Sequence, residues 1–316
     1  MSTENKLKYQ LFCEQETELP IFARPWYLDA VCQAATEDWD VVLVEKSEKI
    51  IASLPYQIKK SGPFSVSTMP FLTKFLGPYL SRNFRSSSQA HKAIKALIEQ
   101  LPPFAFFNQN CFYDLKDWLP FYWKGFQQTT QYSYIIDDLS DLDKVYNNFS
   151  ADYRNNKIKK AKETIRVVMD RSIEEYYEVE AMSFKRQGLA FPFSLEYLKN
   201  YDKTISAQNA RRLFFAIDDK DQIHSVLYLL IDHDRAYYHM AGDNPELRSS
   251  GAGILLVWEA IQYTKNERGL NLFDFEGSTI KTIERVRRQF GARQVPYFNI
   301  SKYGSKLYQW MRILRE

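Results

Sequence analysis

Cysteine is scarce in this sequence, and its placement argues against two common kinds of site. The chain has three cysteines in 316 residues, at Cys13, Cys32 and Cys111. No two of them stand at the short spacing of a redox dithiol or a zinc site, and no His-x-x-x-His pair is present. An odd number of widely separated thiols is typical of a reducing compartment. We therefore expect a cytoplasmic protein without a bound metal.

Long apolar runs and a strong net charge are also missing. No window approaches the roughly 18 to 20 apolar residues that span a bilayer, and the opening MSTENKLKYQLF has no signal-peptide core. The formal charge is +3, so no overall field favours nucleic acid. Apolar material is plentiful, at 45% hydrophobic and 16% aromatic residues, which predicts a folded globular protein.

Apolar and polar periodicity predicts strands and helices along the whole chain. Hairpins are expected over 39–58 and 211–232, where apolar runs flank a polar turn. Residues 62–81 show no sustained period and are expected to form an ordered loop. The other expected elements are helices at 25–35, 86–101, 192–201, 250–266 and 279–290, strands at 104–108, 131–137, 235–243, 271–275 and 295–300, and a final helix.

The two halves of the chain are weakly alike. Residues 25–29 (PWYLD) and 192–196 (PFSLE) are similar, and each stretch precedes a hairpin. A duplicated domain explains this similarity, and so does chance likeness between two helix starts. The expected domains are residues 1–140 and 141–316.

A basic segment lies between the halves, over residues 150–172. Its apolar residues fall on one face of a helix, which leaves the Lys and Arg side chains on the other face. A solvated basic face and an anion-binding surface both fit this pattern. The apolar positions are Tyr153, Ile158, Ala161 and Ile165.

Glycine is scarce too, at 11 residues, yet two glycines stand one residue apart where a helix is expected to begin. The first turn of a helix exposes about four N–H groups, which bind anions together with the helix dipole. Glycines there leave room for a pyrophosphate, the arginine adds a positive charge, and the serine hydroxyls donate or cap. A turn that merely joins strand and helix is the alternative. The residues are Arg248, Ser249, Ser250, Gly251, Ala252 and Gly253.

This stretch resembles the Arg/Gln-x-x-Gly-x-Gly/Ala motif of the GNAT acyltransferases. Residues 271–278 (NLFDFEGS), 290–300 (FGARQVPYFNI) and the basic segment are similar to the FemAB-like branch, which includes peptidoglycan-bridge aminoacyltransferases and BioF2-like acetyltransferases. The basic segment departs from that branch in lacking its usual following glycine. The resemblance covers about 150–300 and is weak over 1–140.

The resemblance implies a mixed α/β (α+β) fold of two tandem GNAT-like domains, each a mostly antiparallel mixed sheet flanked by helices. It also implies that residues 248–253 hold the pyrophosphate of acyl-CoA (acetyl-CoA). The strand before them would separate from its neighbour to admit the pantetheine arm. The implied reaction transfers an acyl group to an amine, on a small molecule or a cell-envelope precursor.

Acyl transfer needs a base for the amine and a donor for the leaving thiolate. Glu276, just after the strand 271–275, is a candidate base, or a charge at the start of the next helix. His239 is a second candidate base, or a hydrogen-bonded core histidine. Tyr238 is a candidate donor, with packing as the alternative.

Four further residues are candidates for binding the acceptor. Lys185 and Arg186 lie between two expected helices and suit an acidic acceptor, although solvated charges also explain them. Arg24 and Trp26 would contribute from the first domain if the site lies between the domains.

Two other functions stay open. An aminoacyl-tRNA donor would serve a peptidoglycan precursor, as in FemAB proteins, which generally lack an intact Arg-x-x-Gly-x-Gly loop and often carry a helical arm. Here the loop is intact and no heptad run suggests such an arm. A non-catalytic FemAB-like module that binds a nucleotide-sugar lipid precursor is the third reading. A tRNA partner is expected only under the second, and the sequence does not indicate an oligomeric state.

Overall fold

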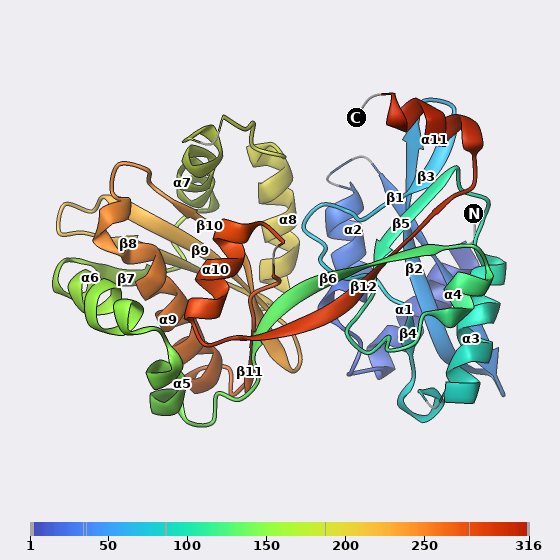
Figure 1. The fold of residues 1–316 in the computed structure, drawn as a ribbon, viewed down its shortest axis with the longest axis horizontal. Helices are drawn as coiled ribbons and strands as arrows, with labels where there is room; N and C mark the ends of the chain where they lie inside the picture. The colour runs from blue at the N-terminus through green and yellow to red at the C-terminus, as the bar shows by residue number, and fades with distance from the viewer. Residues whose placement is uncertain are drawn as a thin grey trace. The chain divides into compact units, whose positions relative to one another are not determined.

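The computed structural model describes residues 3–314 apart from residues 34, 36, 86, 187 and 278. The chain forms two compact units, one of Met1–Gln131 with Pro296–Glu316 and one of Tyr132–Val295. Each unit is a mixed sheet flanked by helices, which confirms the expected fold class (Figure 1). No described helix combines the length and the apolar character needed to cross a membrane.

In the first unit, strand order is β1-β2-β3-β5-β12, with β4 paired to β2. The hairpin predicted over 39–58 is present as β1 and β2, and Ser47 and Glu48 at its turn have positive φ. The stretch 62–81 is not a loop throughout, because it contributes β3 and β4 to the sheet. The elements are α1 (Thr3–Gln15), α2 (Pro25–Gln33), β1 (Asp38–Lys46), β2 (Lys49–Ser61), β3 (Phe64–Ser67), β4 (Tyr79–Leu80), α3 (Ser87–Gln100), β5 (Phe106–Asn110), α4 (Leu119–Trp123), β12 (Arg293–Tyr303) and α11 (Lys306–Ile313).

In the second unit, strand order is β6-β11-β10-β9-β8-β7. The β10–β11 pair is parallel, and the other pairs from β11 to β6 and from β10 to β7 are antiparallel. The elements are β6 (Gln127–Ile136), α5 (Leu142–Asn148), a π-helical turn (Tyr153–Ile158), α6 (Lys159–Thr164), β7 (Arg166–Met169), α7 (Ile173–Arg186), α8 (Leu195–Ala207), β8 (Arg211–Ile217), β9 (Ile223–Ile231), β10 (Arg235–Asp243), α9 (Ala252–Asn266), β11 (Leu272–Asp274) and α10 (Lys281–Gln289).

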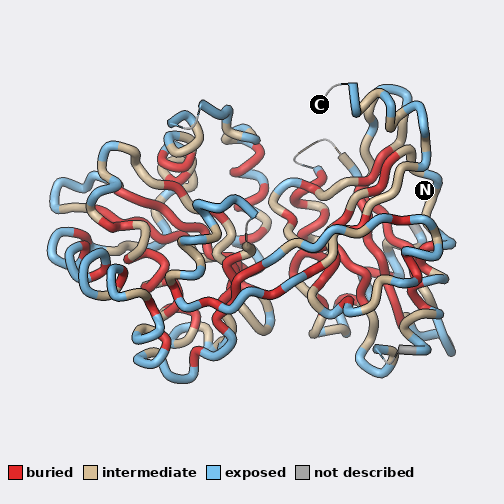
Figure 2. Tube along the Cα trace, viewed as in Figure 1, coloured by how far each residue is buried: buried red, intermediate tan, exposed pale blue. Residues whose placement is uncertain are grey.

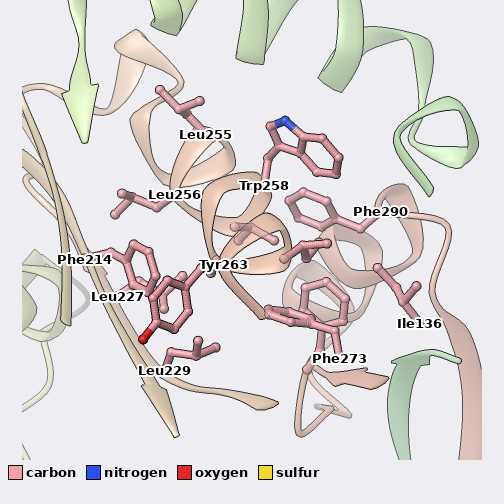
Figure 3. Packing of buried hydrophobic residues seen from close by; sticks show 14 of the residues in the cluster. Ile136, Phe214, Leu227, Leu229, Leu255, Leu256, Trp258, Tyr263, Phe273 and Phe290 are labelled. Carbon is pink, nitrogen blue, oxygen red and sulfur yellow. The ribbon is translucent and has the colours of Figure 1, made fainter. Parts of the chain in front are cut away.

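The sheet of the second unit is buried on both faces. Alternate residues of β9 point to opposite sides, so Leu227 and Leu229 pack with α9 in the main core, which Figure 3 shows. Tyr228 points the other way and contacts Tyr176 of α7 and Tyr201 of α8. The strands are accordingly buried along most of their length in Figure 2. The apolar core thus lies on the α9 face, while the opposite face collects polar aromatic side chains.

The basic segment follows the predicted helical pattern in part. Tyr153, Ile158, Ala161 and Ile165 are all buried, as their spacing predicted. The single expected helix is instead a π-helical turn continued by α6. A π-helical turn is rare and is often found at functional sites.

Phe290→Ala is expected to lower the free energy of unfolding by about 3–5 kcal/mol, the usual cost of emptying a buried aromatic site. Phe290 is 1% exposed and its ring contacts those of Phe149, Tyr153 and Phe275. Urea unfolding measures the change, with Phe71→Ala at a 46% exposed position as the matched control. Equal losses in the two variants would contradict this account of the core.

Candidate active site

The central strands of the second unit separate where the candidate residues lie. β10 and β11 pair over only three residues, Arg235–Tyr237 with Leu272–Asp274. β10 then continues to Asp243, paired with β9 on its other edge, while β11 ends. From Tyr238 onward, β10 therefore has an edge that β11 does not cover. This agrees with the strand separation that the resemblance implied.

Asp274 and Glu276 fix the direction in which the chain leaves β11. The buried carboxylate of Asp274 accepts hydrogen bonds from the Ser133 hydroxyl at 2.6 Å and from the Glu276 amide at 2.8 Å. Glu276 has a φ of 55°, in the left-handed region that side chains rarely adopt. Such strain costs on the order of 1–3 kcal/mol and clusters at functional sites. The turn brings the Glu276 side chain into contact with β10.

His239 joins Glu276 to a tyrosine of α8. Its Nδ1 lies 2.7 Å from Oε1 of Glu276, and its Nε2 lies 3.1 Å from the hydroxyl of Tyr201. His239 is the extra residue of a β-bulge, because the register with β9 shifts between Tyr238 and Met240. Its side chain is 2% exposed, against 13% for Glu276. Within this pair the Glu276 carboxylate is the group with access to solvent.

Tyr238 lies next to the bulge and packs on the α10 side of the sheet. The guanidinium of Arg287 lies 4.1 Å from the centre of its ring, and Phe275 contacts it as well. Burial raises the pKa of Tyr238 above its usual value, although the Arg287 charge opposes part of that rise. Tyr238 is therefore protonated at neutral pH and has a proton to donate.

The glycine motif forms a 3₁₀ turn (Arg248–Ser250) that leads into α9. The hydroxyl of Ser250 accepts a hydrogen bond from the Ala252 amide at 3.3 Å. The amides of Ile254 and Leu255 donate to the Gly251 carbonyl, at 3.1 and 3.2 Å. Among the described residues, no hydrogen bond involves the amide of Ser249. The protein thus caps part of this first turn, and at least one backbone N–H group stays available to an anion.

The two glycines are required by contacts inside the protein. Gly251 has a φ of 78°, and a Cβ there would lie 2.8 Å from the carbonyl oxygen of Lys157. A Cβ at Gly253 would lie 2.6 Å from Oδ1 of Asp243. Packing of the basic segment and of β10 against the motif therefore explains the glycines without a ligand. Arg248 is exposed, with its Nε 3.7 Å from Asp243.

The four acceptor candidates occupy surface or structural positions. Lys185 and Arg186 are exposed in the last turn of α7. In the first unit, Arg24 donates to the carbonyls of Cys13 at 2.7 Å and Thr17 at 3.1 Å, so it satisfies the end of α1. The ring of Trp26, in α2, contacts that of Tyr27. A role in acceptor binding stays a prediction for all four.

Sequence reasoning missed a buried acid, Glu180 of α7. It is 5% exposed, and its Oε2 atom has no hydrogen-bond partner. Burial raises its pKa to about 8, with the nearby Tyr176 hydroxyl acting in the opposite direction. The sequence does contain a signal for this burial, because helical spacing places Glu180 on the same face as the apolar residues Tyr176 and Val179.

One group within the described ranges brings three possible metal ligands together. Asp232, His233 and Asp234 lie in the turn between β9 and β10, with ligand atoms within 4.8 Å of one another. His233 bonds to Asp232 at 2.9 Å, and Asp234 pairs with Arg235 at 2.7 Å. These contacts account for the group without an ion.

Comparison with known proteins gives a family-model match and solved structures with a similar fold. Residues 147–280 match the family model described as acetyltransferase (GNAT) domain. The sequence gives no match among curated proteins. Three solved structures share the fold over nearly the whole chain. They are FemX (TM-score 0.70, 12% identity, covering 93% of this chain and 95% of that one), a lysylphosphatidylglycerol synthetase C-terminal domain, described as putative, from Agrobacterium fabrum (0.58, 10%, 98% and 94%), and a tandem GNAT protein from the clavulanic acid biosynthesis pathway (0.56, 10%, 96% and 96%).

Glu180→Gln is expected to raise the free energy of unfolding, by an amount that grows with pH. The folded-state pKa of Glu180 is about 8, against about 4.3 for a glutamate in an unfolded chain. Between these values the folded chain binds the additional proton, so its stability falls as pH rises. The amide of the variant does not titrate and lacks this loss.

Urea unfolding at about pH 5 and about pH 8 measures the difference. Glu178→Gln, at an exposed position of the same helix, is the control and is expected to follow the parent chain. If the parent and Glu180→Gln lose stability equally between the two pH values, Glu180 does not carry a raised pKa.

Proposed function

We propose that this chain, a GNAT-superfamily transferase with a FemAB-like fold, moves an acyl group from acyl-CoA, acetyl-CoA in the simplest case, to an amine. One observation carries the proposal. β10 parts from β11 after Tyr237, and the glycine motif follows the end of β10. The glycine motif, which is proposed to bind the donor, and the candidate catalytic groups thus lie on β10 and β11 or directly after them.

The motif is the proposed binding site for the donor pyrophosphate. The amide of Ser249 supplies a donor, and exposed Arg248 supplies a positive charge. Lys157 of the basic segment contacts Gly251 through its backbone, so that segment adjoins the motif. These features support an anion at this end of β10, with the thioester lying along the uncovered edge of the strand.

The chemistry requires two proton movements. The neutral amine attacks the thioester carbonyl, the C–N bond forms and the C–S bond breaks. In this proposal Glu276 takes the proton that the nitrogen loses, while His239 positions it through the 2.7 Å hydrogen bond. Tyr238 gives a proton to the departing thiolate and regains one from solvent. The bulge at His239 supports this scheme because it alters the backbone where β10 is uncovered.

Three finer expectations belong to the same proposal. The acceptor is an amine on a small molecule or on a cell-envelope precursor, and the protein works in the cytoplasm. The chain has two domains, 1–140 and 141–316, that arose by duplication. Support comes from the hairpins in both halves, β1–β2 and β8–β9, each preceded by a helix.

Titration calorimetry with acetyl-CoA tests the donor. Micromolar binding is expected, and Arg248→Glu is expected to weaken it about tenfold or more, because a charge-assisted contact contributes about 1.5–3 kcal/mol. Arg293→Glu, at another exposed arginine of the same unit and outside the basic segment, is the control and should bind as the parent does.

The alternative functions are separate outcomes of that experiment. Binding of charged tRNA without binding of coenzyme A would replace the acyl-CoA donor by aminoacyl-tRNA. Binding of a nucleotide-linked glycan precursor without either donor would leave a non-catalytic module. Each result overturns the donor proposed here.

Glu276→Gln is expected to lower kcat about 100-fold or more, in the range for loss of a general base. The amide keeps the shape and a hydrogen-bond partner for His239 but cannot take the proton. Thiol release from acetyl-CoA in the presence of an accepted amine measures the rate. Glu259→Gln in α9 is the control, and an unchanged kcat in Glu276→Gln would remove this residue from the catalytic role.

A further inference from the structure

Three polar atoms lie buried without a hydrogen-bond partner on the α7 face of the second unit. They are Oε2 of Glu180 and the hydroxyl oxygens of Tyr176 and Tyr228, within the part of the chain that the structure describes. Each residue is at most 5% exposed. A buried polar group without a partner costs about 1–3 kcal/mol. Three such groups close together call for an explanation.

The three groups form one cluster. Tyr176 and Glu180 stand four residues apart on α7, which places them on the same face of the helix. The ring of Tyr176 contacts that of Tyr228 from β9, with centroids 5.9 Å apart. Tyr228 in turn lies 6.0 Å from the ring of His239. The cluster therefore adjoins the proposed catalytic residues.

The position of Glu180 is fixed by a close approach of α7 to β10. A Cβ at Gly242 would lie 2.5 Å from the Cα of Glu180, so only glycine permits this contact. One turn further along, the Ser183 hydroxyl donates to the Asp243 carbonyl and accepts from the Asp243 amide. Both contacts involve the part of β10 that β11 does not cover. The acid is thus held beside the same stretch of strand as the proposed donor.

No described cation forms an ion pair with Glu180. Tyr176 of α7 is the ionisable group that acts on it directly, and Tyr238 of β10 is within reach of its charge. Tyr228 of β9 contacts Tyr176 and is itself acted on by Tyr201 and Asp202 of α8 and by Arg211 of β8. Burial raises the pKa of Glu180 to about 8, so its carboxyl is protonated at neutral pH. When Glu180 ionises, its negative charge adds to the rise in the pKa of Tyr238. Arg211 is paired with Asp202, so Glu180 itself is left without a counter-charge, which a ligand can supply.

We propose that Glu180, Tyr176 and Tyr228 form the binding site for the acceptor's amino group, and that the acceptor enters as a primary ammonium ion. The inference rests on the proposed function. An ammonium ion has three N–H donors, and the cluster offers three oxygen atoms without partners. Its positive charge also meets the one acid of the cluster. A carboxylate or amide ligand would leave that acid without a counter-charge.

The proton balance explains why two acids serve one reaction. On binding, Glu180 releases its proton to solvent and pairs with the ammonium ion. Glu180 then takes one proton back, which leaves a neutral amine able to attack. Glu276 takes the second proton after the C–N bond forms, and Tyr238 protonates the thiolate. Overall, an ammonium ion and a thioester give an amide, a thiol and one proton.

The test uses the full chain, acetyl-CoA and five probe amines: ethanolamine, glucosamine, L-lysine, L-alanine and putrescine. Thiol release is measured for the parent, Glu180→Gln, Tyr228→Phe and the exposed control Glu178→Gln. For any amine that the parent accepts, Glu180→Gln is expected to raise KM at least about tenfold, the effect of about 1.4 kcal/mol. Tyr228→Phe should raise KM less, and Glu178→Gln should match the parent.

Proton release on amine binding gives a readout that a merely structural role would not move. Calorimetry at about pH 7 in buffers of different ionisation enthalpy should show close to one proton released by the parent and none by Glu180→Gln. Circular dichroism confirms that the variants are folded.

The outcomes separate this inference from the function on which it rests. If the parent neither binds acetyl-CoA nor releases thiol with any probe, the proposed function fails and this site fails with it. If the parent turns over but Glu180→Gln keeps its KM and its proton release, the acyltransferase stands and the ammonium site is refuted.

Discussion

The separation of β10 from β11 is the constraint on which the rest of the candidate site depends. The strands pair only as far as Tyr237 and Asp274. Buried Asp274 then holds the Glu276 amide, and Glu276 turns back to His239 through a left-handed backbone conformation. A carboxylate, an imidazole and an uncovered strand edge are thereby gathered in one place. Without that separation, Glu276 would continue along the sheet and His239 would lie on a fully paired strand.

The glycine motif has a different physical basis from the one its sequence suggests. Its glycines permit close packing with the Lys157 carbonyl and the Asp243 carboxylate, and its first helical turn is capped in part by Ser250. The basic segment, β10 and α9 therefore meet at the motif in close contact. The proposed anion binding uses backbone that this packing has already oriented, which lowers the entropy cost of holding a flexible donor.

Local patterns in the sequence predicted the elements, while contacts between distant residues escaped them. The hairpins and α9 follow from apolar periodicity, which is a property of neighbouring residues. The β3 and β4 strands do not follow from periodicity. Their short irregular stretches become strands by pairing with β2 and, for β3, also with β5. Glu276 and His239 were recognised singly, but their contact and the Tyr201 hydroxyl depend on the β10 bulge. Glu180 looked like an ordinary helix residue because Gly242, its reason for burial, lies 62 positions further along the chain.

A crystal structure of the chain with coenzyme A bound tests the central claim most directly. A pyrophosphate is expected within hydrogen-bond distance of the Ser249 amide and beside the Arg248 guanidinium. The pantetheine arm should lie along β10 beyond Tyr237, and the sulfur should end beside Tyr238 and Glu276. Coenzyme A bound elsewhere, or an arm that leaves this edge of β10 empty, would contradict it.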